Sequence, residues 1–340
     1  MRSGACVHSG STAWLAAGVL GFVAAVAGLV PLLPLPSPRA VDTARALEPP
    51  LTGPLLSRSL DVGRNGDASP DDWIRRGFGD VGPLSRGLIR SRVAVFGRLE
   101  AGGLFGRDEL GRDLCSRVCW GARVSLSAAA IAGVVSLLIG VAWGATAGWA
   151  GGWIDDVMMR VVDVLDSIPL LFLVVFLVTV LGEDSVRLAL DSLGIGRLAI
   201  FYAVVAAVSW LSMARIVRAK VLELRGATMI EAARAIGAGP ARIIARHLLP
   251  NLAAVIVVKL SLVVPRVMLF ESFLSFLGLG VQPPDVSWGL LANAGFRALV
   301  PFDPAWWLFL FPAMALAVTL LSLGFLGDGL GAGGERKWRP

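Results

Sequence analysis

Few side chains in this sequence have the types and spacing needed for chemistry. The two closest thiols, Cys115 and Cys119, stand four residues apart, which places them on one face of a helix. No third or fourth metal ligand lies near them in the sequence, so the spacing does not describe a zinc site. We expect both to be small apolar residues. The alternative is a disulfide between them, if the segment faces an oxidising compartment.

Motifs for nucleotide chemistry and for hydrolysis are also missing from the sequence. The P-loop pattern G-x-x-x-x-G-K-[ST] does not occur, so we do not expect this chain to hydrolyse ATP. Gly329, Gly331 and Gly334 match G-x-G-x-x-G, but they follow an apolar helix rather than a strand, which excludes a dinucleotide site. Neither a Ser/His/Asp set nor H-E-x-x-H is found, and we predict no catalytic residue, metal or cofactor.

The composition is that of a membrane protein. Of the 340 residues, 56% are hydrophobic and 16% are charged, against about 25% charged in soluble domains. Charge is absent from 124–154 and from 304–327, and either run is long enough to cross a hydrocarbon layer of roughly 30 Å as a helix. The basic residues are dispersed between apolar spans, without the basic stripe that binds nucleic acid.

Hydropathy predicts an all-α fold with six membrane-spanning helices. Their approximate ranges are 13–33, 125–149, 165–181, 198–213, 252–279 and 305–326. The first is also compatible with a cleaved signal peptide, because Arg2 precedes it. Its apolar run is long for a signal core and no clear A-x-A cleavage site follows it, so we expect a retained helix.

A long segment, 34–122, separates the first two spans. Up to about Leu104, prolines, glycines, arginines and aspartates alternate without helical or strand periodicity, which indicates loops. A short amphipathic stretch, 107–123, then leads into the second span. The sequence therefore divides into four parts. A stub with the first helix covers 1–33, the long segment covers 34–122, a five-helix core covers 123–331, and a tail covers 332–340.

The short loops set the orientation. Seven arginines and lysines lie in the loop between the fourth and fifth spans, at positions 215, 218, 220, 225, 234, 242 and 246. The short loops on the other side carry only Arg187 and Arg297. The positive-inside rule therefore places both termini and the loop 215–250 in the cytoplasm, and the segment 34–122 outside.

Two groups of charges do not fit this simple pattern. After the second span, four carboxylates outnumber Arg160, at Asp155, Asp156, Asp163 and Asp166. The fifth span is interrupted by Lys259, Arg266 and Glu271. Charges inside a bilayer are costly and normally face the protein interior or a water-filled cavity. We predict that Glu271 and Arg266 face a pore; the alternative is a long tilted helix with its charges near the ends.

The loop 228–251 is the most informative segment. Thr228 and Glu231 stand at the spacing of a capping box, which would satisfy amides at a helix start. Ala232 and Ala233 favour the helix that follows. Gly237 comes where a helix would end with a left-handed residue.

A second short helix is expected after this turn. Pro240 suits its first turn, where the missing amide costs nothing, and the helix should end before Pro250. The loop is thus predicted to be a helical hairpin whose small residues allow another protein to approach the backbone closely. A surface hairpin with solvated arginines is the alternative.

This hairpin resembles the coupling loop of binding-protein-dependent ABC importers. Their pattern is E-A-A, three residues, Gly, nine residues, Ile, one residue and Leu-Pro. The matching positions here are Glu231, Ala232, Ala233, Gly237, Leu249 and Pro250. His247 replaces the isoleucine, as is usual in the dipeptide and oligopeptide branch. In that family the loop fits a cleft on the ATPase subunit and transmits its motion.

Further stretches resemble the same branch, and together they span about 105–331. They are 108–113 with Ser116 and Arg117, 151–153 with Asp156, 274–280, 282–284, 287–289 and 327–330. The sequence departs from the family at Arg107, where a threonine is usual. The segment 34–104 is longer than usual for the branch, and the resemblance implies no role for it.

The resemblance implies a type I importer permease in the cell inner membrane. Its partners would be a second homologous permease, two P-loop ATPases and an extracytoplasmic binding protein, and its solute a short peptide or a molecule of similar size. Two other classes remain open from the residues alone. One is an ion-coupled transporter with Glu271, Arg266 and Asp166 as a charge relay; the other is a non-transporting scaffold.

Overall fold

The computed structural model describes residues 5–53, 55–58, 70–79, 81–97, 99–181, 183–193, 197–300 and 303–336. Most of the regular structure in these ranges is helical, and the predicted all-α class is confirmed. Two small antiparallel strand pairs accompany the helices: β1 (Leu56–Arg58) with β2 (Leu99–Ala101), and β3 (Leu299–Val300) with β4 (Asp303–Pro304).

Within the described ranges, five helices are long and apolar enough to cross a membrane. They cover Thr12–Leu32, Leu114–Ala150, Leu198–Arg225, Pro240–Phe276 and Trp307–Leu330. The bent pair α6 (Gly152–Ser167) and α7 (Leu170–Leu181) gives a sixth span when it is counted as one. On that count the six predicted spans are present.

Several helices extend beyond the apolar stretch that predicted them. The second span starts in α4 (Leu114–Val135) and continues through a π-helical turn into α5 (Val141–Ala150). The fourth span joins α9 (Arg197–Ser209) to α10 (Leu211–Arg225). Hydropathy marks only the apolar part of a helix, whereas the backbone hydrogen bonding continues into its polar ends. The remaining long helices are α1 (Ala5–Leu29), α13 (Leu249–Phe276) and α15 (Trp307–Arg336).

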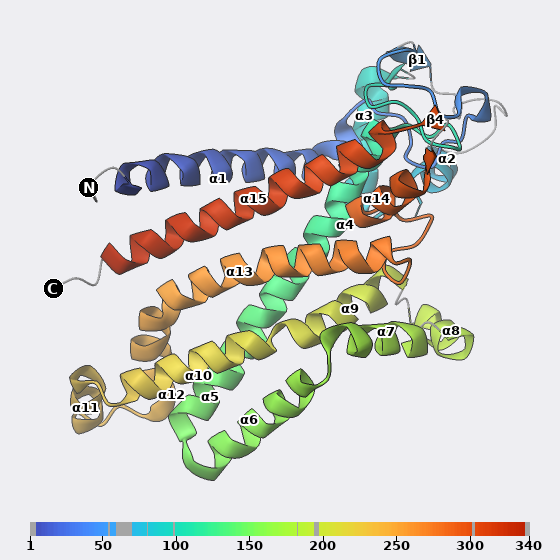
Figure 1. Cartoon of the computed structure of the whole chain (residues 1–340). Coiled ribbons are helices and arrows are strands. Elements are labelled where there is room, and N and C mark those ends of the chain that lie inside the picture. Colours follow the sequence, from blue (N-terminus) through green and yellow to red (C-terminus); the bar gives the residue numbers. More distant parts are fainter. Residues whose placement is uncertain are drawn as a thin grey trace. The chain divides into compact units, whose positions relative to one another are not determined.

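The third span is not the single helix that was predicted. α6 ends at Ser167, and α7 starts at Leu170 after a bend of 85°; the bend is visible in Figure 1. Ile168 has extended dihedrals, with φ −82° and ψ 124°. A residue that precedes proline is pushed out of the helical region, so Pro169 accounts for the break.

The segment 34–104 contains more structure than its sequence predicted. It forms α2 (Pro70–Phe78) and α3 (Pro83–Phe96), besides the β1–β2 pair. Ile74, Phe78 and Ile89 form a small apolar core, and Arg92 is buried against Glu100 at 3.1 Å. The prediction of loops alone is wrong here, because tertiary packing stabilises short helices whose own apolar pattern is weak.

The amphipathic stretch predicted at 107–123 is in fact a turn followed by the start of α4. Asp113 caps the helix, since its Oδ1 accepts the Ser116 amide at 2.7 Å. Cys115 and Cys119, in the first turns of α4, are free thiols. Cys115 packs with Val30 and Leu35. The expected apolar role of Cys115 is confirmed, and the structure has no disulfide between the two.

The chain divides into two compact units. The first, here called the hairpin unit, comprises Met1–Gly18, Ser127–Phe270 and Leu320–Pro340. The second, here called the motif unit, comprises Val19–Leu126 and Glu271–Thr319. The predicted coupling loop lies in the first unit, and most of the stretches that surround Glu271 lie in the second.

In the hairpin unit, α5 and α10 lie side by side (Figure 1). Gly140, Gly144 and Gly148 recur every four residues and give this segment a flat face without side chains, against which α10 packs closely. A Cβ atom at Gly144 would collide with the backbone of Ala214 and Arg218. This close approach fixes α10, which carries the hairpin at its end.

Candidate functional site

The first helix of the predicted coupling hairpin is α11 (Thr228–Ala235). Its N-cap is Ala227, with extended dihedrals and no side-chain cap. The predicted capping box is therefore wrong. Thr228 is already the first helical residue, so its hydroxyl lies one position too late to cap. The Ile230 amide donates instead to the Ala227 carbonyl at 2.8 Å.

The left-handed turn predicted at Gly237 is present, with φ +82°. The Gly237 amide donates to the Arg234 carbonyl at 2.9 Å, and the Ala238 amide donates to the Ala233 carbonyl at 3.0 Å. This pair of bonds is a Schellman motif, which satisfies the last carbonyls of α11. Glycine is favoured there because it has no Cβ to make a left-handed backbone costly.

The second helix begins as predicted but ends differently. Pro240 opens α12 (Pro240–Ile243), which passes through a π-helical turn, Ile244–Leu248, directly into α13. The helix therefore does not stop before Pro250. A π-helical turn changes the hydrogen-bond spacing next to the proline, which has no amide to donate. The Asn251 side-chain amide donates to the His247 carbonyl at 2.6 Å.

One face of the hairpin is packed into the hairpin unit. Ile230 and Ala233 on α11 are buried with Ile243 and Leu248 of the second helix. The same cluster includes three residues of α10, namely Met213, Val217 and Val221. The hairpin is thus attached to α10 by packing and to α13 by a continuous helix.

The opposite face is open. The Ile236 side chain at the tip is 87% exposed, and Met229 is 40% exposed. Arg234 stacks over the Trp149 ring at 4.8 Å from its centroid. Of the eight residues predicted to couple, Thr228, Glu231, Ala232, Gly237 and Pro250 are exposed, His247 and Leu249 are half-buried, and Ala233 is buried. An exposed apolar tip on a rigid hairpin is a surface suited to a partner protein.

The carboxylates that follow the second span have partners on α10, which the sequence alone did not reveal. Asp155 accepts two hydrogen bonds from Arg218, at 2.5 and 2.7 Å. Arg215 donates to Asp166 at 2.6 Å and to Asp163 at 2.9 Å. Two arginines of the basic helix thus pair with three carboxylates of the acidic stretch, although the two segments are far apart in the sequence.

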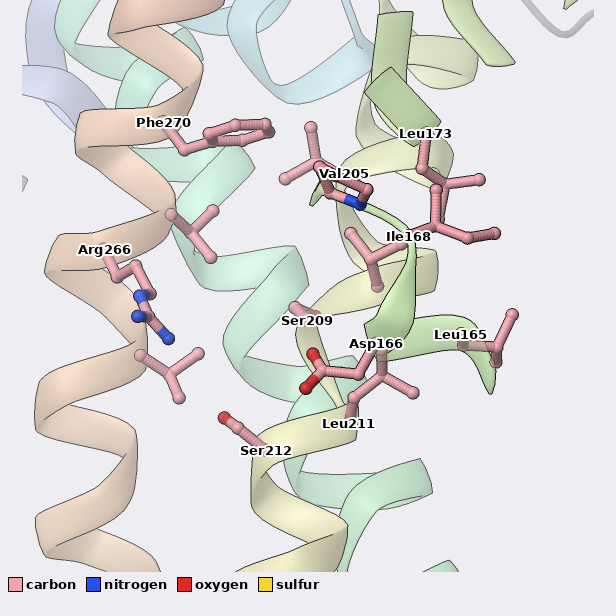
Figure 2. A pocket seen from close by; sticks show the side chains of 14 residues that line it. Leu165, Asp166, Ile168, Leu173, Val205, Ser209, Leu211, Ser212, Arg266 and Phe270 are labelled. Atoms are coloured by element: carbon pink, nitrogen blue, oxygen red, sulfur yellow. The ribbon is translucent and has the colours of Figure 1, made fainter. Parts of the chain in front are cut away.

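Arg266 lines a cavity of about 160 Å³ within the hairpin unit. The bent pair α6–α7 forms one wall, the junction of α9 and α10 forms the second, and α13 forms the third. Figure 2 shows the Arg266 guanidinium and the Asp166 carboxylate pointing into the cavity from opposite sides. The two groups are not joined by an ion pair. That the cavity belongs to a pore remains a prediction.

Glu271 lies in the motif unit and is fully buried. Its carboxylate accepts hydrogen bonds from the hydroxyls of Ser125 and Ser275 at 2.9 Å, and from Ser272 at 3.3 Å. The predicted pore-facing position of Glu271 stays a prediction, and its contacts in this chain are with protein.

The stretches that resembled one family meet around Glu271. Ser287 caps α14 (Trp288–Arg297), and the Trp288 indole donates to the Val118 carbonyl at 2.9 Å. A Cβ atom at Gly289 would collide with the backbone of Ser272. The repeated serines and the Ser-Trp-Gly motif were the sequence signal for this cluster.

Comparison with known proteins decides the family. Residues 140–340, which include the hairpin and the cavity, match the family model "Binding-protein-dependent transport system inner membrane component". The chain belongs to this family.

Curated members of the family show the same relationship. The dipeptide transport system permease protein DppC of Bacillus subtilis is 41% identical over 226 residues, which are 66% of each chain. The oligopeptide transport system permease protein OppC of Escherichia coli K12 is 43% identical over 232 residues, which are 68% of this chain and 72% of that protein. OppC of Bacillus subtilis is 38% identical over 228 residues.

Membership in this permease family decides between the classes of membrane protein that the sequence left open. The chain is a multi-pass inner-membrane protein, and it is the transmembrane permease of an ATP-driven importer rather than an ion-coupled carrier. The matched part spans about two thirds of the length of the DppC relative. The family model starts at residue 140 and so leaves out the segment 34–104.

Proposed function

We propose that this permease imports short peptides, or solutes of similar size, and that the hairpin 228–250 is where an ATPase subunit drives it. The observation that supports this is the hairpin itself. Its inner face is locked into the protein by a buried apolar cluster, while its tip presents Ile236 with 87% of the side chain exposed. The peptide solute is inferred from the names of the dipeptide and oligopeptide relatives.

The attachment of the hairpin explains how a displacement of its tip would be transmitted to the cavity that contains Arg266. α10 and α13 both carry the hairpin, and both line the cavity that contains Arg266. A displacement of α11 would therefore move two walls of that cavity. ATP binding shifts the permease only if its free energy differs between two states of the pore. The mechanism is alternating access between those states.

The partners follow from the same proposal. They are a second homologous permease, two P-loop ATPases and an extracytoplasmic solute-binding protein, since the family is that of binding-protein-dependent transport. ATP would be used on the ATPase subunits, with no catalytic residue or cofactor on this chain. Both termini and the hairpin would lie in the cytoplasm, and the segment 34–122 outside.

Purification from native membranes in mild detergent tests the assembly, with mass spectrometry of the proteins that accompany the chain. We expect a second six-helix permease and P-loop ATPases. In right-side-out vesicles, uptake of a labelled dipeptide should need ATP enclosed in the lumen, which is the hairpin side. A chain that purifies alone and accumulates solute with a proton gradient but without ATP would contradict the proposal.

A further inference from the structure

The cavity in the hairpin unit has an unusual distribution of charge. It measures about 160 Å³, which is space for roughly five water molecules at ~30 Å³ each. Its walls are mostly leucine, isoleucine and valine, with four polar side chains among them: Asp166, Ser209, Ser212 and Arg266. Mostly apolar walls with a few convergent polar groups are the usual lining of a ligand site.

Arg266 is the cationic side of this cavity. It lies in the middle of α13, within a span that reaches from Pro240 to Phe276. Its guanidinium makes no ion pair with any residue that the structure describes. A charge at that depth is costly unless it meets a partner or water. Arginine binds carboxylates through paired N–H donors, so a carboxylate is the group that this side of the cavity lacks.

Asp166 is the anionic side. Its Oδ2 accepts a hydrogen bond from Arg215 at 2.6 Å, and Arg215 also donates to Asp163 at 2.9 Å. Two carboxylates therefore share one guanidinium, and the cluster keeps one net negative charge. Asp166 Oδ1 receives no hydrogen bond from the described residues. An ammonium group of a solute fits this position.

Two hydroxyls lie along α9 and α10, on either side of Trp210. Ser209 is hydrogen-bonded to the carbonyls of Ala132 and Ala206, which occupies its proton and leaves its oxygen free to accept. Ser212 has no hydrogen-bond partner in the described part of the chain, and Figure 2 shows its hydroxyl at the cavity. Both can bind the polar main chain of a solute.

From this geometry we propose that the cavity is a solute-binding site for zwitterionic peptides. Arg266 binds the C-terminal carboxylate, and Asp166 binds the N-terminal ammonium group. A solute without a carboxylate would leave Arg266 without an ion-pair partner, and a solute without an ammonium group would leave the excess negative charge of the Asp163–Asp166–Arg215 cluster unbalanced. The proposal rests on the proposed import function, and it adds the two residues that recognise the ends of the solute.

The test uses the complete transporter in proteoliposomes, with Cys6, Cys115 and Cys119 replaced by serine and Ser212→Cys as the reporter. The readout is the rate at which a water-soluble thiosulfonate modifies this thiol. The probes that compete are dialanine, its C-terminal amide and its N-acetyl form. They act directly on the cavity, so the selectivity of the binding protein does not enter.

We expect dialanine to slow the modification. The amide and the N-acetyl form should each need a roughly tenfold higher concentration, because each lacks one charge-assisted hydrogen-bond set. Arg266→Gln should remove the preference for dialanine over its amide. Asp166→Asn should remove the preference for dialanine over its N-acetyl form.

The matched controls lie on the same helices but do not line the cavity. Lys259→Gln removes a cation from α13, and Asp156→Asn removes an anion from α6; both should keep the two preferences. Equal protection by all three probes, preferences that persist in Arg266→Gln and Asp166→Asn, or a Ser212→Cys thiol that the reagent never reaches would each overturn the proposal.

ATP-driven uptake of labelled dialanine, measured with the transporter in which Cys6, Cys115 and Cys119 are replaced, tells failure of the binding site from failure of the import function. If uptake is normal but the preferences are absent, the binding site is wrong and the importer stands. If the wild-type transporter takes up no dialanine with ATP and binding protein present, the proposed solute class fails, and the site assignment fails with it.

Discussion

The Asp155 carboxylate on α6 is held by the Arg218 guanidinium on α10 through two hydrogen bonds, Nε to Oδ1 at 2.5 Å and Nη2 to Oδ2 at 2.7 Å. Asp155 is 5% exposed, so little water is available to replace its partner. The pair ties the acidic helix after the second span to the helix that carries the coupling hairpin. It therefore fixes one wall of the solute cavity relative to another.

Arg218→Gln should destabilise the permease, because it leaves a buried carboxylate without its charged partner. We expect a loss of roughly 1–3 kcal/mol in the free energy of unfolding, measured as a lower unfolding midpoint in detergent. The double variant with Asp155→Asn should lose less than the sum of the single variants. Lys220→Gln is the control, since its ion pair with Glu223 is exposed and should contribute at most about 1 kcal/mol. If Arg218→Gln and Lys220→Gln lowered the free energy of unfolding equally, Arg218 would not have the structural role inferred here.

Gly237→Pro should abolish the coupling turn. Proline fixes φ near −65° and has no amide, whereas Gly237 has φ +82° and donates to the Arg234 carbonyl. Membrane insertion should remain normal while ATPase subunits no longer copurify. Glu231→Lys, on the exposed face, should weaken docking without unfolding the hairpin. Gly226→Ala is the control, because Gly226 has φ −93° and open space around it. Normal transport by both hairpin variants would refute the coupling role.

Gly144→Val should separate α5 from α10. Its side chain would meet the backbone of Ala214, which cannot move aside as a flexible side chain would. Overpacking typically costs about 1–3 kcal/mol, and we expect at least this loss of stability together with reduced transport. Gly21→Val in α1 is the control, because nothing lies within 4 Å of a Cβ at that position. A Gly144→Val protein as stable as the control would show that α5 and α10 are not in close contact at this glycine.

Glu271→Ala should leave several serine hydroxyls buried without their common acceptor. We expect a loss of roughly 1–3 kcal/mol for this reason, measured by thermal unfolding of the purified transporter. Glu271→Gln keeps one acceptor oxygen and should lose less. Should the two variants lose stability equally, the hydrogen bonds from Ser125 and Ser275 would not be the cause.

Local sequence patterns predicted the features that depend on neighbouring residues in the chain, namely the membrane spans and the turn of the hairpin. The apolar runs predicted the spans, and Gly237 and Pro240 predicted the turn of the hairpin through their own backbone preferences. The capping box failed by one position, because an extended Ala227 starts the helix without help from a side chain. The break at Pro169 was readable from the sequence, but an average of hydropathy over a window conceals it.

Contacts between distant segments could not be predicted in the same way. No spacing rule connects Asp155 to Arg218, or Ser125 to Glu271, because the fold alone brings these residues together. The helices of the segment 34–104 depend on the burial of a few side chains such as Ile89 and Arg92. The cavity likewise needs segments from several separate helices, so Arg266 and Asp166 were visible in the sequence as charges while the cavity that they both line was not.

The central claim is that the hairpin is driven by an ATPase, and photo-crosslinking from its tip tests this most directly. A photoreactive amino acid would replace Ile236 in the chain expressed in its native membrane, with Phe172 of α7 as the control; both side chains are exposed, at 87% and 70%. We predict that position 236 crosslinks to a protein with a P-loop, that the yield changes with ATP, and that position 172 gives no such product. Crosslinks from position 236 only to lipid, or to proteins without a P-loop, would contradict the account.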